Sequence, residues 1–372
     1  MAGTGRYIGL MSGTSLDGVD GVAAEFSGDT PRILAHADLP LPADLRAELL
    51  ALNTPGHDEI GRMSRAAQAL ADLYAEVVGR LLSHTGLTAA DFRAIGAHGQ
   101  TVRHRPDLGY TVQLNAPARL AERTGIAVVA DLRSRDIAAG GQGAPLVPAF
   151  HAAVFGTDRP QAVVNLGGIA NITLLSPSGV IGYDTGPANL LLDLWCHRHT
   201  GRSYDEDGRY AASGQVQDAL LSELIASEPW LAEPPPKSTG RDLFNAPWLD
   251  RRLADWETRH GPVGAADVQA TLLALTAETV AREIRRQMPD CQAAWICGGG
   301  ARNPVLMSAL GAALPCPVAP TDQAGIPAQQ MEALAFAWLA HRHVQGEAGN
   351  LPAVTGAAGP RILGAYYPGQ VR

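Results

Sequence analysis

The chain has 372 residues, of which 46% are hydrophobic and 18% charged, a composition typical of a globular protein long enough for two domains. A formal net charge of −8 argues against nucleic-acid binding, which usually requires a basic face. No apolar run approaches the roughly 18 residues of a membrane span, and the N-terminal residues lack the apolar stretch of a secretory signal. The four cysteines show neither C-x-x-C nor zinc spacing. We therefore expect a cytoplasmic protein without membrane or nucleic-acid partners.

Lysine usage excludes several enzyme classes. The chain contains 28 arginines and a single lysine, Lys237, which follows three consecutive prolines. A Walker A loop, a protein kinase and a pyridoxal enzyme each need a lysine in a defined context. Lys237 fits neither of the first two contexts and fits the third poorly. The chain also lacks the Gly-x-Ser-x-Gly and His-Glu-x-x-His patterns of common hydrolases and zinc proteases.

The first half of the chain alternates strand and helix patterns. Strands are predicted at 7–11 and 19–26, joined by a polar turn that contains glycine, so we expect a β-hairpin. Apolar residues then recur at the three-and-four spacing of an amphipathic helix over 61–85. Two short strands are predicted at 94–97 and 126–130.

The second half repeats this pattern after a glycine-rich stretch. Three closely spaced strands come first, and helices with one further strand follow them. The predicted elements are strands at 162–166, 172–175 and 180–183, helices at 188–199, 215–226 and 266–288, a strand at 293–297, and helices at 303–314 and 328–343.

The recurrence of a hairpin-plus-helix unit at half the chain length predicts two similar α/β domains. Mixed sheets flanked by helices are expected in both, with a site in a cleft between them. The sequence shows no residue-level repeat and no clear linker. We place the first domain at 1–136, joined by the C-terminal segment 346–372, and the second at 137–345.

Glycine turns are candidates for phosphate binding. Gly13-Thr14-Ser15 follows the first strand, Gly167-Gly168 lies in the second hairpin, and Gly298-Gly299-Gly300 follows a later strand. Glycine lets the backbone approach a phosphate, and nearby amides and hydroxyls then donate to its oxygens. The alternative is that these residues only form turns. Three such turns, two at equivalent places in the two halves, favour a nucleotide site without a P-loop.

Asp184 is a candidate for proton transfer. It ends a predicted strand beside Thr185-Gly186-Pro187, where a carboxylate can face a ligand. The alternative is a helix N-cap, although Thr185 or Asn189 would cap more naturally. Local sequence leaves both roles open.

Nine sequence blocks together resemble those of the anhydro-N-acetylmuramic acid kinases. They appear in the family's order and span nearly the whole chain. The blocks are IGLMSGTSLDGVD at 8–20, GAHGQT at 96–101, ADLRSRD at 130–136, GGQGAPL at 140–146, NLGGIAN at 165–171, YDTGP at 183–187, PKSTGR at 236–241, CGGG at 297–300 and MEALAFA at 331–337.

The resemblance implies a fold similar to the actin, Hsp70 and hexokinase ATPases, with two RNase-H-like domains closing on ATP and Mg²⁺. Met11-Ser12 stands where most of that superfamily carries an aspartate before the first turn. Asp17 is then expected to hold the metal, directly or through water, with Asp20 as the alternative. The implied ATP-binding residues are Gly13, Thr14, Ser15, Leu16, Asp17, Gly18, Val19, Asp20, Gly167, Gly168, Asn171, Gly298, Gly299 and Asn303.

The implied reaction opens the 1,6-anhydro bridge of the amino sugar with water and phosphorylates O6, as in peptidoglycan recycling. Asp184 would activate the water, and Glu332 would hold the sugar and assist at C1, unless it is only a polar residue near a helix start. Arg133 is expected to contact the lactyl carboxylate or the reacting sugar, or else to form a surface ion pair with Asp131 or Asp136. His98 and Gln100 would contact the sugar, although a core histidine is also plausible. The role of Lys237 stays open.

Two other classes remain to be distinguished. One is an ATPase-fold switch protein without a small-molecule acceptor, which the sugar-specific blocks around His98, Arg133 and Glu332 argue against. The other is a carbamoyl-transferring relative, which would bind metal through paired histidines at helical spacing, a pattern absent here. A homodimer is a further possibility.

Overall fold

The structure, a computed structural model, describes residues 5–13, 16–27 and 31–370. It divides into two compact units: unit 1 comprises Met1–Phe155 with Gln330–Arg372, and unit 2 comprises Gly156–Gln329. Each unit has a mixed β-sheet with helices packed on it, which confirms the predicted α/β class. Among the described helices none is both long and apolar enough to cross a membrane.

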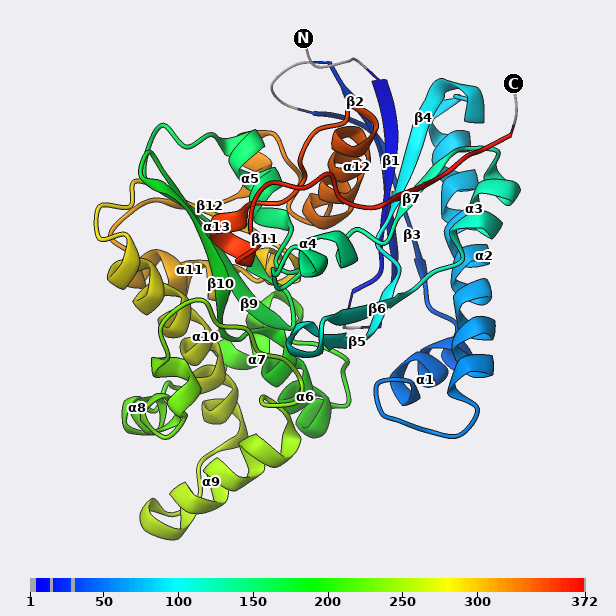
Figure 1. The fold of residues 1–372 in the computed structure, drawn as a ribbon. Coiled ribbons are helices and arrows are strands. Elements are labelled where there is room, and N and C mark those ends of the chain that lie inside the picture. Colours follow the sequence, from blue (N-terminus) through cyan, green and yellow to red (C-terminus); the bar gives the residue numbers. More distant parts are fainter. Residues whose placement is uncertain (1–4, 14–15, 28–30, 371–372) are drawn as a thin grey trace. The chain divides into compact units, whose positions relative to one another are not determined.

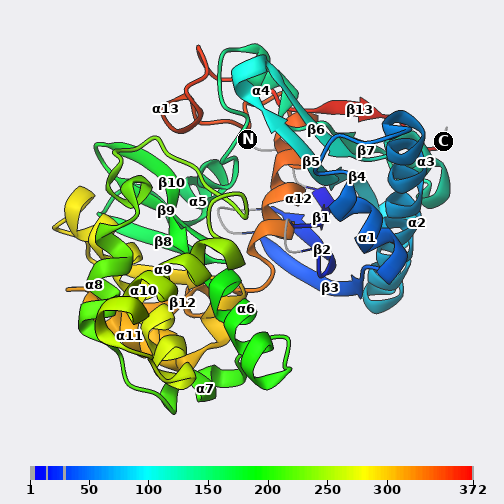
Figure 2. The same ribbon diagram turned by 90° about the horizontal axis from the view of Figure 1, so that it is seen from below.

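The main sheet of unit 1 has six strands in the order β13-β7-β4-β1-β2-β3. Figure 1 shows β1, β2 and β4 within the fold, and the strand order can be followed in Figure 2. β1, β4 and β7 are parallel, whereas β2, β3 and β13 run antiparallel to their neighbours. The predicted β1–β2 hairpin is confirmed, and β3 and β13 are additional strands. The bounds are β1 Gly5–Met11, β2 Gly18–Phe26, β3 Arg32–Pro40, β4 Phe92–Ala97, β7 Val128–Ala130 and β13 Ala365–Tyr367.

Two long helices cover opposite faces of this sheet. Gly21 faces α2 (Glu59–Thr85), whose Val77 lies 2.4 Å from where a Cβ on that glycine would stand. Gly9 and Gly96 face α12 (Met331–Val344), and a Cβ on either would come within 2.0 Å of a helix carbonyl oxygen. Since β1 residues 9 and 10 point to opposite faces and Leu10 pairs with Gly21, the two helices lie on opposite sides. Glycine therefore lets α12 approach the sheet backbone closely.

The rest of unit 1 consists of a small hairpin, β5–β6, and short helices. The sequence predicted none of these elements. They are α1 Ala43–Ala51, η1 Ala89–Asp91, β5 Gln100–Arg105, η2 Pro106–Leu108, β6 Tyr110–Leu114, α3 Pro117–Thr124, α4 Ser134–Ala138, α5 Val147–Phe155 and α13 Pro352–Thr355.

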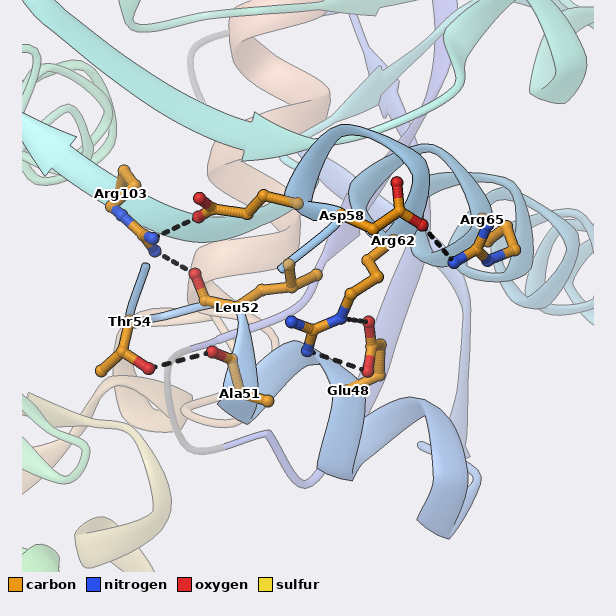
Figure 3. Close-up of polar contacts among 9 residues, drawn as sticks. Glu48, Ala51, Leu52, Thr54, Asp58, Arg62, Arg65 and Arg103 are labelled. Atoms are coloured by element: carbon orange, nitrogen blue, oxygen red, sulfur yellow. Dashed lines mark hydrogen bonds and ion pairs between the residues drawn. The ribbon is translucent and has the colours of Figure 1, made fainter. Parts of the chain in front are cut away.

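Arginines hold the connection between α1 and α2 (Figure 3). Arg62 on α2 forms an ion pair with Glu48 on α1, with 2.7 Å between Nε and Oε1. Arg103 on β5 donates to the carbonyl oxygen of Leu52, where α1 ends. These contacts join α1, α2 and the β5–β6 hairpin, which explains how a short helix of weak amphipathic character is kept in place.

Unit 2 repeats the topology of unit 1 (Figure 2). Its sheet has the order β10-β9-β8-β11-β12, which matches β3-β2-β1-β4-β7 strand for strand: an antiparallel three-strand meander followed by two parallel strands. The predicted repeat is thus confirmed at the level of topology, and the arrangement is RNase-H-like in both units. The bounds are β8 Gln161–Leu166, β9 Ile169–Ser176, β10 Gly179–Pro187, β11 Ala294–Cys297 and β12 Val318–Pro320.

Helices α6, α10 and α11 contribute side chains to one apolar core with this sheet. The predicted helices over 188–199, 215–226, 266–288 and 303–314 are confirmed with small shifts, and α9 is additional. The bounds are α6 Asn189–Thr200, η3 Glu206–Gly208, α7 Arg209–Ala212, α8 Asp218–Ala226, η4 Pro229–Ala232, α9 Ala246–His260, α10 Ala265–Gln287, η5 Gly299–Arg302, α11 Pro304–Ala313 and η6 Thr321–Ala324.

The division into units differs from the predicted boundaries at 136–137 and 345–346. Segment 137–155 and helix α12 belong to unit 1, although the sequence placed both in the second domain. The reason is packing: α12 lies against β1 and β4 through Gly9 and Gly96, and Phe150 of α5 contacts Trp338 of α12 with ring centroids 5.9 Å apart. Neither contact leaves a signal in hydrophobic periodicity.

A buried carboxylate ties the C-terminal segment to unit 1. Asp136 on α4 is fully buried and accepts hydrogen bonds from the amide of Asn350 (2.6 Å), the hydroxyl of Thr355 (2.7 Å) and the backbone N–H of Gly143 (2.8 Å). Each bond to a charged acceptor is worth about 1.5–3 kcal/mol, and each donor left unpaired in the interior is costly.

We expect Asp136→Ala to lower the free energy of unfolding by about 3–5 kcal/mol, because three buried donors lose their acceptor at once. Urea denaturation followed by circular dichroism measures this change. Glu122→Ala, on an exposed position of α3, is the control and should stay within about 0.5 kcal/mol of the parent. A loss below about 1 kcal/mol for Asp136→Ala would contradict the proposed anchoring.

Candidate active site

Asp184 lies in a row of residues that crosses the sheet of unit 2. On β10 it pairs with Asn171 of β9, which pairs with Asn165 of β8, and that residue pairs with Cys297 of the parallel strand β11. Because β8 and β11 are parallel, the loops after them leave the same edge of the sheet. The row therefore places Asp184 and Asn171 at the edge that carries the glycine turns.

Two of the three glycine turns meet at this edge. A Cβ on Gly298 would lie 2.4 Å from the side-chain oxygen of Asn165 and 2.9 Å from the backbone of Leu166, and Gly298 has a φ of +80°. Only glycine fits such a position. The carbonyl oxygens of Gly167 and Gly168 accept hydrogen bonds from the N-terminal amides of α6, at 3.0 Å from Asn189 and 3.1 Å from Leu190. The two turns thus form one continuous backbone surface.

The Asp184 carboxylate is anchored through one oxygen. Oδ2 accepts hydrogen bonds from the Ser238 hydroxyl at 2.8 Å and the Thr239 backbone N–H at 2.9 Å. Among the described residues none donates to Oδ1. Burial raises the pKa of this carboxyl, while the bonds from Thr239 and Ser238 and the charge of Lys237 act in the opposite direction. A fixed, half-buried carboxylate of raised pKa is suited to accept a proton.

The alternative role of Asp184, a helix N-cap, is not seen. β10 continues to Pro187 with a bulge between Asp184 and Gly186, so the strand is longer than predicted. Helix α6 follows with Ala188 at its N-cap position and no side-chain cap.

Lys237 is buried and paired. Its Nζ lies 3.4 Å from Oε1 of Glu283, with the two side chains only 1% and 2% exposed. Nζ also donates to the carbonyl oxygen of Leu231 at 3.2 Å and stands 4.6 Å from the ring centre of Trp230. The amine is therefore engaged within unit 2.

In unit 1 two predicted sugar-binding residues follow the carboxyl ends of parallel strands, His98 after β4 and Arg133 after β7. Ser12, which was not predicted, follows the neighbouring parallel strand β1. The Ser12 hydroxyl lies 3.0 Å from the Tyr74 hydroxyl and donates to the carbonyl oxygen of Gly99 at 3.0 Å. Parallel topology brings these residues together at one edge of the sheet.

His98 is neutral and orients Arg133. Nε2 of His98 lies 2.8 Å from Nη2 and 3.3 Å from Nε of Arg133, so it must accept rather than donate. Nδ1 then carries the proton and donates to the carbonyl oxygen of Ser12 at 3.3 Å. Burial and the charge of Arg133 lower the pKa of His98 to about 3. The ring of Phe336 on α12 packs against it, with ring centroids 4.7 Å apart.

Arg133 keeps two N–H groups for a ligand. Of its five donors, Nε and one on Nη2 point to His98, and one on Nη1 donates to Gly143 at 2.7 Å. The remaining two, one on each terminal nitrogen, have no acceptor among the described residues and are the donors left for a carboxylate. Burial lowers the pKa of Arg133 to about 10, so it stays charged at neutral pH, while Glu332 and Asp136 favour that charge.

Glu332 begins α12 and lies within electrostatic range of Arg133. Burial and the negative charge of Asp20 raise the pKa of its carboxyl, while Arg133 lowers it. Gln100, 2% exposed, leaves its side-chain oxygen without a hydrogen-bond donor among the described residues. The structure thus groups His98, Arg133 and Glu332 in unit 1, with an unsatisfied amide on the strand that follows His98.

The first glycine turn is described only in part, because Thr14 and Ser15 lie outside the described residues. The side chains of Leu16 and Val19 belong to the core of unit 1, so only their backbone can meet a ligand. Asp17 is exposed and has no side-chain partner among the described residues. Asp20 lies 3.5 Å from His36. Within the described residues no group of three or more His, Cys, Asp or Glu side chains could by itself hold a metal.

The side-chain oxygen of Asn303 caps α11, accepting from the backbone N–H groups of Val305 and Leu306 at 3.1 Å. Its oxygen is thereby occupied, and its amide nitrogen is the group left for a ligand.

Sequence analysis missed four residues at these sites: Ser12, Tyr74, Ser238 and Thr239. Ser238 and Thr239 fall in the PKSTGR block, and Ser12 in the opening block, so their positions carried a signal. Nothing in the sequence indicates which residues they contact, because Ser238 and Asp184 are 54 residues apart and Ser12 and Tyr74 are 62 apart.

Comparisons with known proteins identify the family of the chain. The family model described as anhydro-N-acetylmuramic acid kinase matches residues 5–369. A protein of that name from Bordetella petrii is 60% identical over 97% of this chain and 96% of its own length. One from Paraburkholderia xenovorans is 56% identical over 98% of each. Among solved structures, an activator of 2-hydroxyisocaproyl-CoA dehydratase from Clostridium difficile with bound ADPNP is 13% identical, covering 92% of this chain and 96% of that chain, with a TM-score of 0.47. By its family match and these relatives, the chain belongs to the anhydro-N-acetylmuramic acid kinase family.

Proposed function

We propose that this protein phosphorylates 1,6-anhydro-N-acetylmuramic acid with ATP and opens its anhydro bridge in the same reaction. Support comes from the family match over residues 5–369 and from relatives at 56–60% identity that carry that enzyme name. The observation that carries the mechanism is the Asp184 carboxylate, which is held through one oxygen while the other has no donor among the described residues.

The substrate's own chemistry dictates the role of the base. O6 is tied to C1 in the bridge, so no free 6-hydroxyl exists for a base to deprotonate. Water therefore attacks C1, the C1–O6 bond breaks, and O6 takes the γ-phosphoryl group of ATP. The proton leaves the attacking water to Asp184, and the products are N-acetylmuramic acid 6-phosphate and ADP. A positioned base of this kind contributes about 10²–10⁴ in rate.

The cluster in unit 1 is suited to hold the sugar. The two N–H groups of Arg133 that have no acceptor among the described residues would bind the lactyl carboxylate, and neutral His98 keeps the guanidinium plane fixed. Glu332, with its raised pKa, would contact the ring and assist at C1. The side-chain oxygen of Gln100, unsatisfied among the described residues, would accept from a sugar hydroxyl.

ATP would bind to the glycine turns, because glycine lets the backbone approach phosphate oxygens closely. Mg²⁺ usually keeps several waters and takes only one or two carboxylates besides the phosphates, so the exposed carboxylate of Asp17 fits that role. When bound, the ion would neutralise charge on the transferred phosphoryl group. The remaining ATP-binding residues proposed from the sequence are Gly13, Thr14, Ser15, Leu16, Gly18, Val19, Asp20, Gly167, Gly168, Asn171, Gly298, Gly299 and Asn303.

We place the reaction in the cytoplasm, in the recycling of peptidoglycan sugar. All four cysteines are buried and none forms a disulfide, which suits a reducing compartment.

A phosphoryl-transfer assay tests the proposed function. ADP formation with 1,6-anhydro-N-acetylmuramic acid is compared with that for N-acetylglucosamine, glucose and no acceptor. We expect turnover with the anhydro sugar alone. Equal ATP hydrolysis in all four reactions would instead indicate an ATPase without an acceptor.

Reaction in ¹⁸O-labelled water tests which atom the water attacks. We expect the label on C1 of the product and unlabelled oxygen at O6, because water attacks carbon and O6 leaves from C1. Mass spectrometry before and after phosphatase treatment separates label on the sugar from label in the phosphoryl group, and fragmentation of the sugar separates the C1 oxygen from O6. Unlabelled product incubated in labelled water corrects for exchange of the anomeric oxygen. Label in the phosphate ester would refute attack at C1.

A further inference from the structure

The single lysine of the chain belongs to a buried network next to Asp184. Nζ of Lys237 lies 3.4 Å from Oε1 of Glu283 and donates to the carbonyl oxygen of Leu231 at 3.2 Å. The two charged side chains are 1% and 2% exposed. Since the amine is fully surrounded by groups of unit 2, a direct contact with a ligand does not explain it.

Glu283 on α10 joins the two segments that meet at Asp184. Its Oε2 accepts from the Tyr183 hydroxyl at 2.9 Å, and its Oε1 faces Lys237. Tyr183 directly precedes Asp184 on β10, and Lys237 directly precedes Ser238. The backbone N–H of Asp184 also donates to the carbonyl oxygen of Lys237 at 3.2 Å. The buried Glu283 carboxylate thus fixes Tyr183, which precedes the proposed base Asp184. It also fixes Lys237, which precedes Ser238, a donor to that base.

Strand geometry places this network behind the base. Adjacent side chains of a strand point to opposite faces, so Tyr183 points to Glu283 while Asp184 points to the other face. Segment 237–239 is therefore held on both faces of the strand. Lys237 pairs with Glu283 on one face, and Ser238 and Thr239 donate to Oδ2 of Asp184 on the other.

We propose that Lys237 is a positioning residue: paired with Glu283, it holds segment 237–239 so that one oxygen of Asp184 stays bound and the other stays free for water. The inference rests on the proposed base role of Asp184. A buried ion pair is generally no more stabilising than well-packed apolar side chains of the same volume. Its place beside the base therefore points to geometry rather than to stability.

Lys237→Met tests the proposal. The fold should persist, because Glu283 keeps the Tyr183 hydroxyl and an ion pair with Arg286 at 2.6 Å. We expect kcat to fall about 10- to 100-fold, as for a small misplacement of a reacting group, with KM for ATP unchanged. The acidic limb of the kcat profile should move to higher pH, because the charge of Lys237 lowers the pKa of Asp184. The other charged groups at this network are Glu283, Arg286 and Arg282.

Three further variants separate positioning from stability. Leu310→Ala, a fully buried core residue of α11, should lower Tm but leave the acidic limb of the pH profile in place. Tyr183→Phe removes one hydroxyl from Glu283 and should reduce kcat less than Lys237→Met. Lys237→Arg keeps the charge and should recover part of kcat and the position of the limb.

Two results for Lys237→Met would overturn the positioning role. One is parental kcat. The other is a loss of Tm and kcat while the acidic limb of the pH profile keeps its position, as expected for Leu310→Ala. If Lys237→Met does not fold, Tyr183→Phe decides by kcat at parental Tm: we expect a smaller but measurable loss of kcat, and parental kcat would overturn the positioning role. Failure of the base role itself would appear separately, as retained turnover in Asp184→Asn.

Discussion

Asp184→Asn is expected to reduce product formation by about 10²–10⁴ while ATP still binds. The amide has the same shape, and its oxygen can still accept from Ser238 and Thr239, so the local structure should be kept. Only the capacity to take a proton from water is lost. Steady-state formation of the phosphate ester and calorimetric ATP binding measure the two effects.

Asp242→Asn is the matched control for this substitution. Asp242 is an exposed carboxylate three residues after Thr239, and its replacement should leave kcat within about twofold. Turnover of Asp184→Asn within about tenfold of the parent would count against a general base at this position.

The pH profile gives an independent view of the same carboxyl. A base acts in its deprotonated form, so kcat falls as the pH drops through its pKa. Because burial raises the pKa of Asp184, the acidic limb should lie at higher pH than the range of an exposed aspartate, and it should disappear from the residual activity of Asp184→Asn.

Arg133→Met is expected to lower kcat/KM for the sugar about 10- to 150-fold, chiefly through KM. The estimate follows from losing a charged hydrogen-bonding fork worth about 1.5–3 kcal/mol. Arg133→Lys should recover little, since an ammonium group cannot supply two parallel donors. Arg135→Met, an exposed neighbour on α4, serves as the control.

A substrate with an esterified lactyl group makes this test specific. The parent protein should lose affinity for the ester, whereas Arg133→Met should treat acid and ester alike, because the interaction is already absent. If Arg133→Met discriminates between acid and ester as strongly as the parent, the guanidinium does not bind the carboxylate. Its role is then limited to its hydrogen bonds with His98 and Gly143.

Much of the fold is predictable from local pattern. Helix α2 has an uninterrupted amphipathic period, and the β1–β2 and β8–β9 hairpins have apolar strands around glycine turns. The β5–β6 hairpin was missed because its polar residues obscure the period. Helix α9 does have a helical period, with Trp248, Leu249, Leu253 and Trp256 on its buried face, and sequence analysis overlooked it. In β5, three of the six residues are Gln100, Arg103 and Arg105, which a strand pattern does not favour.

The site was predicted unevenly for the same physical reason. The family blocks identified Asp184, Arg133, His98 and Glu332 by position, but they gave no partner for any of them. Partners depend on which strands are neighbours, and the parallel order β1, β4, β7 brings Ser12, His98 and Arg133 together across more than a hundred residues of chain.

The sequence by itself determined the α/β class, the repeat, the glycine turns and the family, because these depend on periodicity and on residues in fixed local order. Only the tertiary structure decided that α12 packs on the first sheet and that Lys237 is buried against Glu283. Both outcomes depend on residues far away in the chain. Gly9 and Gly96 have no side chains and so leave room for α12, and the Lys237 amine pairs with Glu283, 46 residues away. Contacts of that range are set by how the sheets and helices pack, and hydrophobic pattern alone carries no record of them.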